Sequence, residues 1–327
     1  MFQPTVTCCE VVDFVVCLPT GETLVVISET HTAAAAGTWT LGDLTVNRVG
    51  LGGMRLTGSA AFDLGTPSNR EQSITVLRRA RDLGVNHIDT AAFYFSRLRS
   101  ANELINTALA PYPDDLVIGT KVGPGRDPSG QWLPPATPEQ LRGQVEENLR
   151  QLGRDHLDVV SLRVMRPGPI GELFGALADL RTAGMIRHLG LSGVTPEHLS
   201  EAQAIAPVVC VQNRYGLDTR PPGTDALLRT CGEQGIAFVP FFAIAGLGGE
   251  TGASGTASAG ILAVAQAHEA TTAQVRLAWS LQQGPHVLAI PGTGNPDHLV
   301  ENVAAGALRL SPEELARLEP EPKASTD

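Results

Sequence analysis

The sequence has no uncharged apolar run that reaches the roughly 18 residues of a membrane-spanning helix. Its start, MFQPTVTCCEVVDFVVC, also lacks the basic residues and the long apolar core of a secretory signal. The five cysteines show neither zinc-site spacing nor a C-x-x-C redox pair, and no other metal-binding motif is present. We therefore expect a cytoplasmic protein that holds no metal and has no membrane partner.

The sequence also has fewer basic than acidic residues. The chain has 24 Lys and Arg against 34 Asp and Glu, which gives a formal net charge of −10. A polyanion would approach against this field, so nucleic acid is not the expected partner. Apolar residues make up 43% of the chain, too many for disorder, and 327 residues suit two domains or one barrel of roughly 250 residues with an extension.

From Trp39 onward, short β-branched runs alternate with helical patterns, which is typical of repeated βα units around a parallel sheet. Eight runs predict strands at residues 46–52, 85–91, 116–122, 158–164, 187–192, 208–213, 236–242 and 286–291. Thr137-Pro138, Thr195-Pro196 and Asn295-Pro296 supply an N-cap oxygen and a preset φ for three helix starts. The fold class that we predict is α/β, a (β/α)8 TIM barrel with an N-terminal extension.

The extension is residues 1–36, which stand apart from the βα pattern. Two β-rich stretches flank Pro19-Thr20-Gly21-Glu22, and the segment ends in Ala33–Ala36. We interpret it as a hairpin followed by a linker, or as a disordered arm, ahead of a barrel domain at residues 37–327. Glycine-rich residues 246–258 predict a flexible loop rather than a dinucleotide fingerprint, because the third glycine falls one place late.

Polar residues at the ends of the predicted strands indicate an active site, since barrel enzymes collect reactive groups there. Asp89 closes strand two, Tyr94 follows five residues later, and Lys121 closes strand three. A buried Lys needs a carboxylate partner, and Asp89 is the nearest candidate. The ammonium would lower the pKa of the tyrosine from about 10 and make Tyr94 a general acid. The residues alone equally fit a structural ion pair beside a packing tyrosine.

Six motifs occur in strand order: HIDTAAFY, a strand ending in GTK, GLSG, VQN, VPFF, and IPGT followed by HLVEN. In sequence, spacing and strand number they resemble the aldo-keto reductase family, over about residues 38–320. The resemblance implies reduction of an aldehyde or ketone, as small-molecule substrate, to an alcohol with NADPH. It also implies that Asp89, Tyr94 and Lys121 are catalytic, with Tyr94 donating a proton to the carbonyl oxygen.

The end of strand four departs from the commonest family pattern. Arg163 stands where most members have a His that orients the carbonyl. A strand-end Arg is most simply an ion-pair former. Alternatively, Arg163 polarises the carbonyl or pairs with an anionic group of the substrate. The surrounding LDVVSLRVM looks most like the bacterial pyridoxal reductase branch of the family, which implies a pyridoxal-like aldehyde as substrate.

The resemblance also implies where the nicotinamide end of the cofactor binds. It assigns Ser192 and Gln212 to the carboxamide, and it assigns Phe241 to a stack against the nicotinamide ring. Without the resemblance, the same three residues fit a loop cap, a buried hydrogen-bonding side chain and a core ring.

The adenosine end of the cofactor follows strand eight by the same resemblance. It assigns phosphate contacts to Gly292 and Thr293, the 2′-phosphate region to His298, and adenine contacts to Glu301 and Asn302. Gly292 and His298 replace a Lys and an Arg that are common in the family. We therefore expect NADPH to be preferred, with measurable NADH activity.

Trp132, in the loop SGQWLPP after strand three, is either a wall of the substrate pocket or a surface-packing residue. Two other functions also fit the resemblance. One is an NADP-binding sensor barrel with little turnover, and the other is a sugar or ketone reductase of specialised metabolism.

Overall fold

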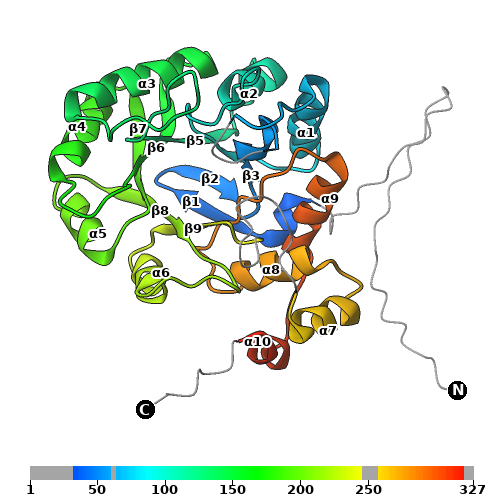
Figure 1. Cartoon of the computed structure of the whole chain (residues 1–327). Helices are drawn as coiled ribbons and strands as arrows, with labels where there is room; N and C mark the ends of the chain where they lie inside the picture. The colour runs from blue at the N-terminus through cyan, green and yellow to red at the C-terminus, as the bar shows by residue number, and fades with distance from the viewer. Residues whose placement is uncertain (1–31, 60–63, 245–256, 320–327) are drawn as a thin grey trace, which may run out of the picture.

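The computed structural model describes residues 32–59, 64–244 and 257–319. A parallel sheet of seven strands, ordered β3-β4-β5-β6-β7-β8-β9, curls into a ring with helices on its outside (Figure 1). The strands are β3 Leu51–Gly52, β4 His87–Asp89, β5 Val117–Val122, β6 Leu157–Arg163, β7 Ile186–Ser192, β8 Val208–Arg214 and β9 Ala237–Phe241. Each strand pairs with the next in the chain, because a crossover connection returns the backbone to the same end of the sheet.

Residues 286–291 complete the ring between β9 and the start of the barrel. Val287 forms an isolated parallel bridge with Phe238, and Ala289 forms another with Val49. The predicted (β/α)8 barrel is therefore confirmed. Its eighth member is held by single bridges rather than by a continuous strand.

An antiparallel hairpin, β1 (Thr38–Leu41) and β2 (Leu44–Asn47), precedes the barrel. Leu41 and Val46 of the hairpin pack with apolar side chains from the barrel strands. In Figure 1 the hairpin lies across the middle of the ring. It therefore covers one end of the barrel with apolar side chains.

The hairpin turn identifies which end is covered. Asp43 Oδ1 lies 2.6 Å from Nε2 of His188, which is near the start of β7, so the hairpin covers the N-terminal ends of the strands. The predicted first strand at 46–52 needs a correction, because residues 46–47 belong to the hairpin and β3 begins at Leu51.

Helices alternate with the strands and pack on the outside of the ring (Figure 1). They are α1 Arg70–Asp82, α2 Ala101–Leu109, α3 Pro138–Leu152, α4 Gly171–Thr182, α5 Pro196–Gln203, α6 Thr224–Glu233, α7 Ala259–Ala267, α8 Thr272–Leu281, α9 Pro296–Ala304 and α10 Pro312–Leu318. The three predicted starts at proline are confirmed in α3, α5 and α9. In α9, for example, Asn295 Oδ1 accepts a hydrogen bond from Asp297 N at 2.8 Å.

A buried polar network fixes the helices behind β4 and β5. Asn148 Oδ1, on α3, accepts hydrogen bonds from Thr120 Oγ1 at 2.6 Å and from Asn102 Nδ2 at 2.9 Å. Thr90 Oγ1 donates to Asn102 Oδ1 at 2.8 Å. Because buried hydrogen bonds are directional, this network sets the positions of two strand ends at which catalytic residues were predicted.

Most of the expected N-terminal extension and most of the glycine-rich loop lie outside the described residues. Residues 1–31, expected to be a hairpin or a disordered arm, and residues 245–256, which include most of the expected loop, lie outside them. Ala33–Ala36, the expected end of the extension, form a 3-10 helix in which Ala33 and Ala36 are buried. Within the three described ranges, no helix has the length and apolar character needed to cross a membrane.

Candidate active site

A cavity of about 650 Å³ opens at the C-terminal ends of the strands. Each of the site residues predicted from the sequence lines it: Asp89, Tyr94, Lys121, Trp132, Arg163, Ser192, Gln212, Phe241, Gly292, Thr293, His298, Glu301 and Asn302. They come from strands β4 to β9 and from the loops and helix that follow the strands. The cavity therefore has the size and position of a small-molecule site in a barrel enzyme.

Asp89 and Lys121 form a buried ion pair at the base of the cavity. Lys121 Nζ donates to Asp89 Oδ1 at 2.8 Å, to Asp89 Oδ2 at 2.6 Å and to Thr90 O at 3.0 Å. Burial alone would lower the pKa of Lys121, but the Asp89 carboxylate and the Tyr94 phenol outweigh burial and raise this pKa. Lys121 is therefore an ammonium at neutral pH.

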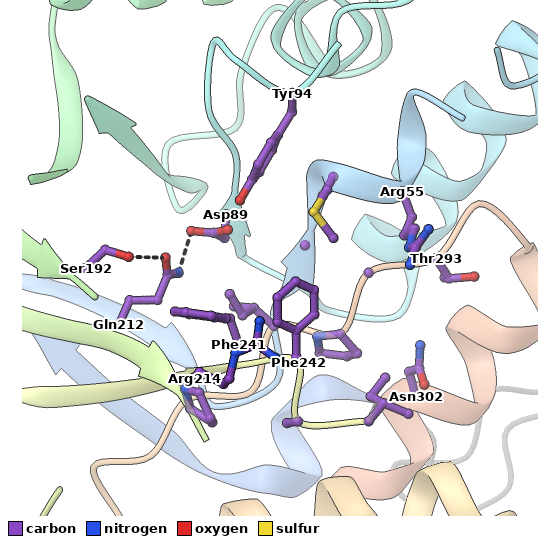
Figure 2. A pocket seen from close by; sticks show the side chains of 18 of the residues that line it. Arg55, Asp89, Tyr94, Ser192, Gln212, Arg214, Phe241, Phe242, Thr293 and Asn302 are labelled. Atoms are coloured by element: carbon purple, nitrogen blue, oxygen red, sulfur yellow. Dashed lines mark hydrogen bonds between the residues drawn. The ribbon is translucent and has the colours of Figure 1, made fainter. Parts of the chain in front are cut away.

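Tyr94 lies beside this pair. Its ring centroid is 4.9 Å from Lys121 Nζ, and Figure 2 shows its hydroxyl pointing toward Asp89. The expectation of a lowered tyrosine pKa needs a correction: burial raises the pKa of Tyr94, and Lys121 and Arg163 oppose this only in part. A phenolate loses much of its hydration in a buried site, so the phenol keeps its proton.

Three further polar side chains connect to Asp89 in a hydrogen-bonded series. Gln212 Nε2 donates to Asp89 Oδ1 at 2.8 Å, and Ser192 Oγ donates to Gln212 Oε1 at 3.3 Å (Figure 2). Arg163 Nη1 donates to Ser192 Oγ at 3.2 Å. The register explains this series, because Arg163 pairs with Ser192 across β6 and β7, and Ser192 pairs with Gln212 across β7 and β8.

Arg163 also lies over an aromatic ring. Its guanidinium carbon is 4.9 Å from the centroid of Phe241, a distance typical of a cation–π contact. One face of Phe241 is thus covered by Arg163. A second planar ring has to stack on the other face or displace the guanidinium.

The part of the cavity farther from Tyr94 is lined by two glycines, Gly52 and Gly292, and by the N-terminus of α9 (Figure 2). A Cβ atom added to Gly52 would lie 2.7 Å from Ile290 O, and one added to Gly292 would lie 3.0 Å from Gly52 O. Only glycine allows β3 and the segment after Ile290 to approach so closely. Thr293 follows directly, and its Oγ1 accepts from Asn295 N, the N-cap of α9, at 3.0 Å.

Trp132 lies at the cavity wall and remains 40% exposed. Its ring packs edge-on against Phe93 with a centroid distance of 5.7 Å, and Phe93 packs edge-on against Tyr94 at 5.1 Å. Trp132 thus lines the cavity and is partly exposed, and its role as a wall of a substrate pocket stays a prediction.

Several residues that line the cavity were not predicted as site residues from the sequence, among them Phe93, Arg214, Phe242 and Arg55. The guanidinium carbon of Arg214 lies 4.9 Å from the Phe242 centroid. Phe242 has a φ of 61°, which is unusual for a bulky residue and keeps its ring at the cavity. Phe93 and Phe242 lie within the motifs HIDTAAFY and VPFF but were not assigned a role, and Arg214 directly follows the motif VQN. Arg55 carried no sequence signal.

Comparison with known proteins gives consistent matches. A model of the aldo/keto reductase family matches residues 48–320. Pyridoxine 4-dehydrogenase of Escherichia coli (strain K12) is 44% identical over 292 residues, which cover 87% of this chain and 98% of that protein. An uncharacterized oxidoreductase of Schizosaccharomyces pombe is 38% identical, covering 89% of this chain and 92% of that protein. An aldo/keto reductase from Klebsiella pneumoniae, solved in complex with NADP and acetate, has a TM-score of 0.70 at 28% identity, covering 89% and 98% of the two chains.

Proposed function

The chain belongs to the aldo/keto reductase family, and on this basis we propose that it reduces an aldehyde or ketone to an alcohol with NADPH. The observation that carries the proposal is the buried Asp89–Lys121 pair beside the Tyr94 hydroxyl, inside the cavity. NADPH, when bound, supplies the hydride that the carbonyl carbon accepts. The protein supplies the proton and the binding surface.

Tyr94 is the proposed proton donor to the carbonyl oxygen. Burial keeps its phenol protonated until the substrate oxygen becomes basic. The Lys121 ammonium, fixed by Asp89, then stabilises the phenolate that remains. Asp89 and Lys121 act together, because the Asp89 carboxylate, with Thr90 O, holds the ammonium in place and is its counter-charge among the described residues.

The cavity residues fit a nicotinamide dinucleotide. Ser192 and Gln212 carry a hydroxyl and an amide that suit the carboxamide, and Phe241 carries a ring for stacking. The wall formed by Gly52 and Gly292, together with Thr293 and the N-terminus of α9, suits phosphate oxygens. Asn302, which is buried, suits the adenine ring. The NADP complex of the Klebsiella pneumoniae relative supports this assignment.

The proposed substrate is a pyridoxal-like aldehyde, because the Escherichia coli relative is named pyridoxine 4-dehydrogenase. Trp132 and Phe93 provide flat apolar walls for a ring of that kind. We also propose a reducing, cytoplasmic location, which is supported by two free and buried cysteines, Cys210 and Cys231.

The test is NADPH oxidation with a panel of aldehydes and ketones that includes pyridoxal. Tyr94→Phe should lower kcat/KM by about 100-fold or more while NADPH binding is retained. Tyr112→Phe is a matched control, because the Tyr112 hydroxyl donates to Leu152 O at 2.7 Å outside the cavity, and it should leave kcat/KM unchanged. NADPH binding without turnover of any carbonyl would instead support the sensor function.

A further inference from the structure

Arg163 is partly buried, and its partners differ from those of other arginines with little exposed surface, which donate to carboxylates or, like Arg126, to backbone carbonyls. Arg276 pairs with Asp218 at 2.8 Å, and Arg154 pairs with Asp158 at 3.2 Å. Among the described residues, Arg163 has no carboxylate partner; its contacts are the hydrogen bond to Ser192 Oγ and the ring of Phe241.

Within the part of the chain that the structure describes, most N–H donors of the Arg163 guanidinium therefore have no partner. A guanidinium has five N–H donors, and a cation taken partly out of water is costly without an anion. Since Arg163 lines the cavity, its remaining donors are available to a ligand there. An anionic group on the ligand would supply the missing partner.

The place where such an anion would bind is close to the reacting carbonyl. Arg163 and Tyr94 line the same cavity. Lys121 Nζ lies 4.9 Å from the Tyr94 ring centroid, and Lys121 pairs in register with Ser161 of β6, so Arg163, two residues further along β6, extends from the same face of the sheet. Because Tyr94 contacts the carbonyl oxygen in the proposed reaction, we expect an anion paired with Arg163 to lie close to that carbonyl.

The walls near Tyr94 favour a flat apolar substrate body. Phe93 and Trp132 pack edge-on at 5.7 Å, and Met54 and Met165 line the same cavity. Aromatic and thioether side chains suit a planar ring. A planar ring also holds a substituent beside the aldehyde at a fixed distance.

Building on the proposed reductase function, we propose that Arg163 recognises an anionic oxygen ortho to the aldehyde group, so that the substrates are planar aromatic aldehydes with an ionised ortho oxygen. An ionised 3-hydroxypyridine-4-carbaldehyde belongs to this class. Arg163 then determines substrate specificity by binding the ortho oxygen, and this role does not depend on a contact with the carbonyl oxygen.

The experiment compares two matched pairs of aldehydes with NADPH, at one pH at which both phenols are ionised. The ortho pair is salicylaldehyde and 2-methoxybenzaldehyde, and the para pair is 4-hydroxybenzaldehyde and 4-methoxybenzaldehyde. In each pair, the ratio of kcat/KM for the ionised over the methoxy compound is measured. A phenolate donates electrons into the carbonyl and slows hydride attack from either position, so an ortho advantage reports recognition.

The wild-type ortho ratio should exceed the para ratio by about tenfold or more, as a charge-assisted hydrogen bond predicts. Arg163→Met should bring the two ratios within about threefold of each other, and Arg163→Lys should give an intermediate value because the planar fork is lost. Arg214→Met is the matched control, since Arg214 lines the same cavity over Phe242, and it should keep the ortho advantage.

Equal ortho and para ratios in the wild type would overturn the inference, and this result requires no variant to fold. An ortho advantage that survives Arg163→Met, or that only Arg214→Met removes, would also overturn it. If no aldehyde or ketone of the panel is reduced, these four aldehydes and pyridoxal included, the proposed function itself fails. Turnover of the methoxy compounds without an ortho advantage refutes the role of Arg163 alone.

Discussion

Replacing Asp89 by Asn removes the charge that neutralises Lys121 and hardly changes the size of the side chain. In the native protein, Lys121 Nζ lies 2.8 and 2.6 Å from the two carboxylate oxygens, and the Lys121 and Asp89 side chains are 5% and 12% exposed. Loss of one partner from such a pair costs about 3–5 kcal/mol, because the remaining charge is buried and uncompensated. Asp89→Asn keeps an oxygen acceptor, so we expect about 3 kcal/mol.

A double-mutant cycle isolates the interaction. Lys121→Met should also destabilise the protein, since it leaves a buried carboxylate, but the combined Asp89→Asn, Lys121→Met variant should be within about 1–2 kcal/mol of wild type. Urea denaturation followed by circular dichroism measures each free energy of unfolding. All three variants should lose about 100-fold or more in kcat/KM, because each lacks part of the group that stabilises the Tyr94 phenolate.

The control is an exposed ion pair on α3. Glu147 and Arg150 lie 2.7 Å apart with 43% and 64% of their side chains exposed, so Glu147→Gln should cost less than about 1 kcal/mol. The reasoning is refuted if Asp89→Asn costs no more than Glu147→Gln. It is also refuted if the double variant is less stable than both single variants.

Three further predictions follow from other residues. Burial lowers the pKa of His87 to about 4, from an ordinary value of 6.5, so between pH 6.5 and 4 the unfolded chain binds a proton at this residue and the folded protein does not. The free energy of unfolding should therefore be highest above pH 6.5 and fall as the pH drops toward 4. His87→Gln should reduce this fall, measured by urea denaturation at several pH values. Gly52→Ala places a Cβ 2.7 Å from Ile290 O, so it should destabilise the protein by about 1–3 kcal/mol and weaken NADPH binding, measured by calorimetry. Gly143→Ala is the control, because no atom lies within 4 Å of the added Cβ, and it should have neither effect. Because Gly292 and His298 line the cavity and neither is a permanent cation, NADH should support measurable turnover, and the ratio of kcat/KM for the two cofactors tests this.

The positions of the site residues could be predicted because strand order determines them. Parallel strands end on the same side of a barrel, so residues that close different strands, such as Asp89, Lys121 and Ser192, had to meet there. Ser192 and Gln212 were predicted from a resemblance alone, and the register between β7 and β8 now explains why they lie side by side.

The remaining features depended on tertiary contacts that no local pattern shows. The hairpin at Thr38–Asn47 has strands of four residues, and its apolar Val46 is stabilised by the barrel interior rather than by its neighbours in sequence. The direction of the Tyr94 pKa depended on how far burial outweighs the nearby ammonium. Phe242, which Arg214 contacts, has a positive φ, and no sequence signal predicted that angle.

Residues 286–291 are joined to each neighbour in the ring by one isolated bridge, Val287 to Phe238 on one side and Ala289 to Val49 on the other, so the sheet is least continuous at these two joints. Phe241 ends β9, and Thr293 follows residues 286–291, so these two residues lie on the two sides of the first joint. A molecule that contacts both residues therefore links the two sides of a joint at which Phe238 exchanges two backbone hydrogen bonds with residues 286 and 288. Loading the pocket should then protect the backbone amides at this joint from hydrogen exchange more than those between β6 and β7.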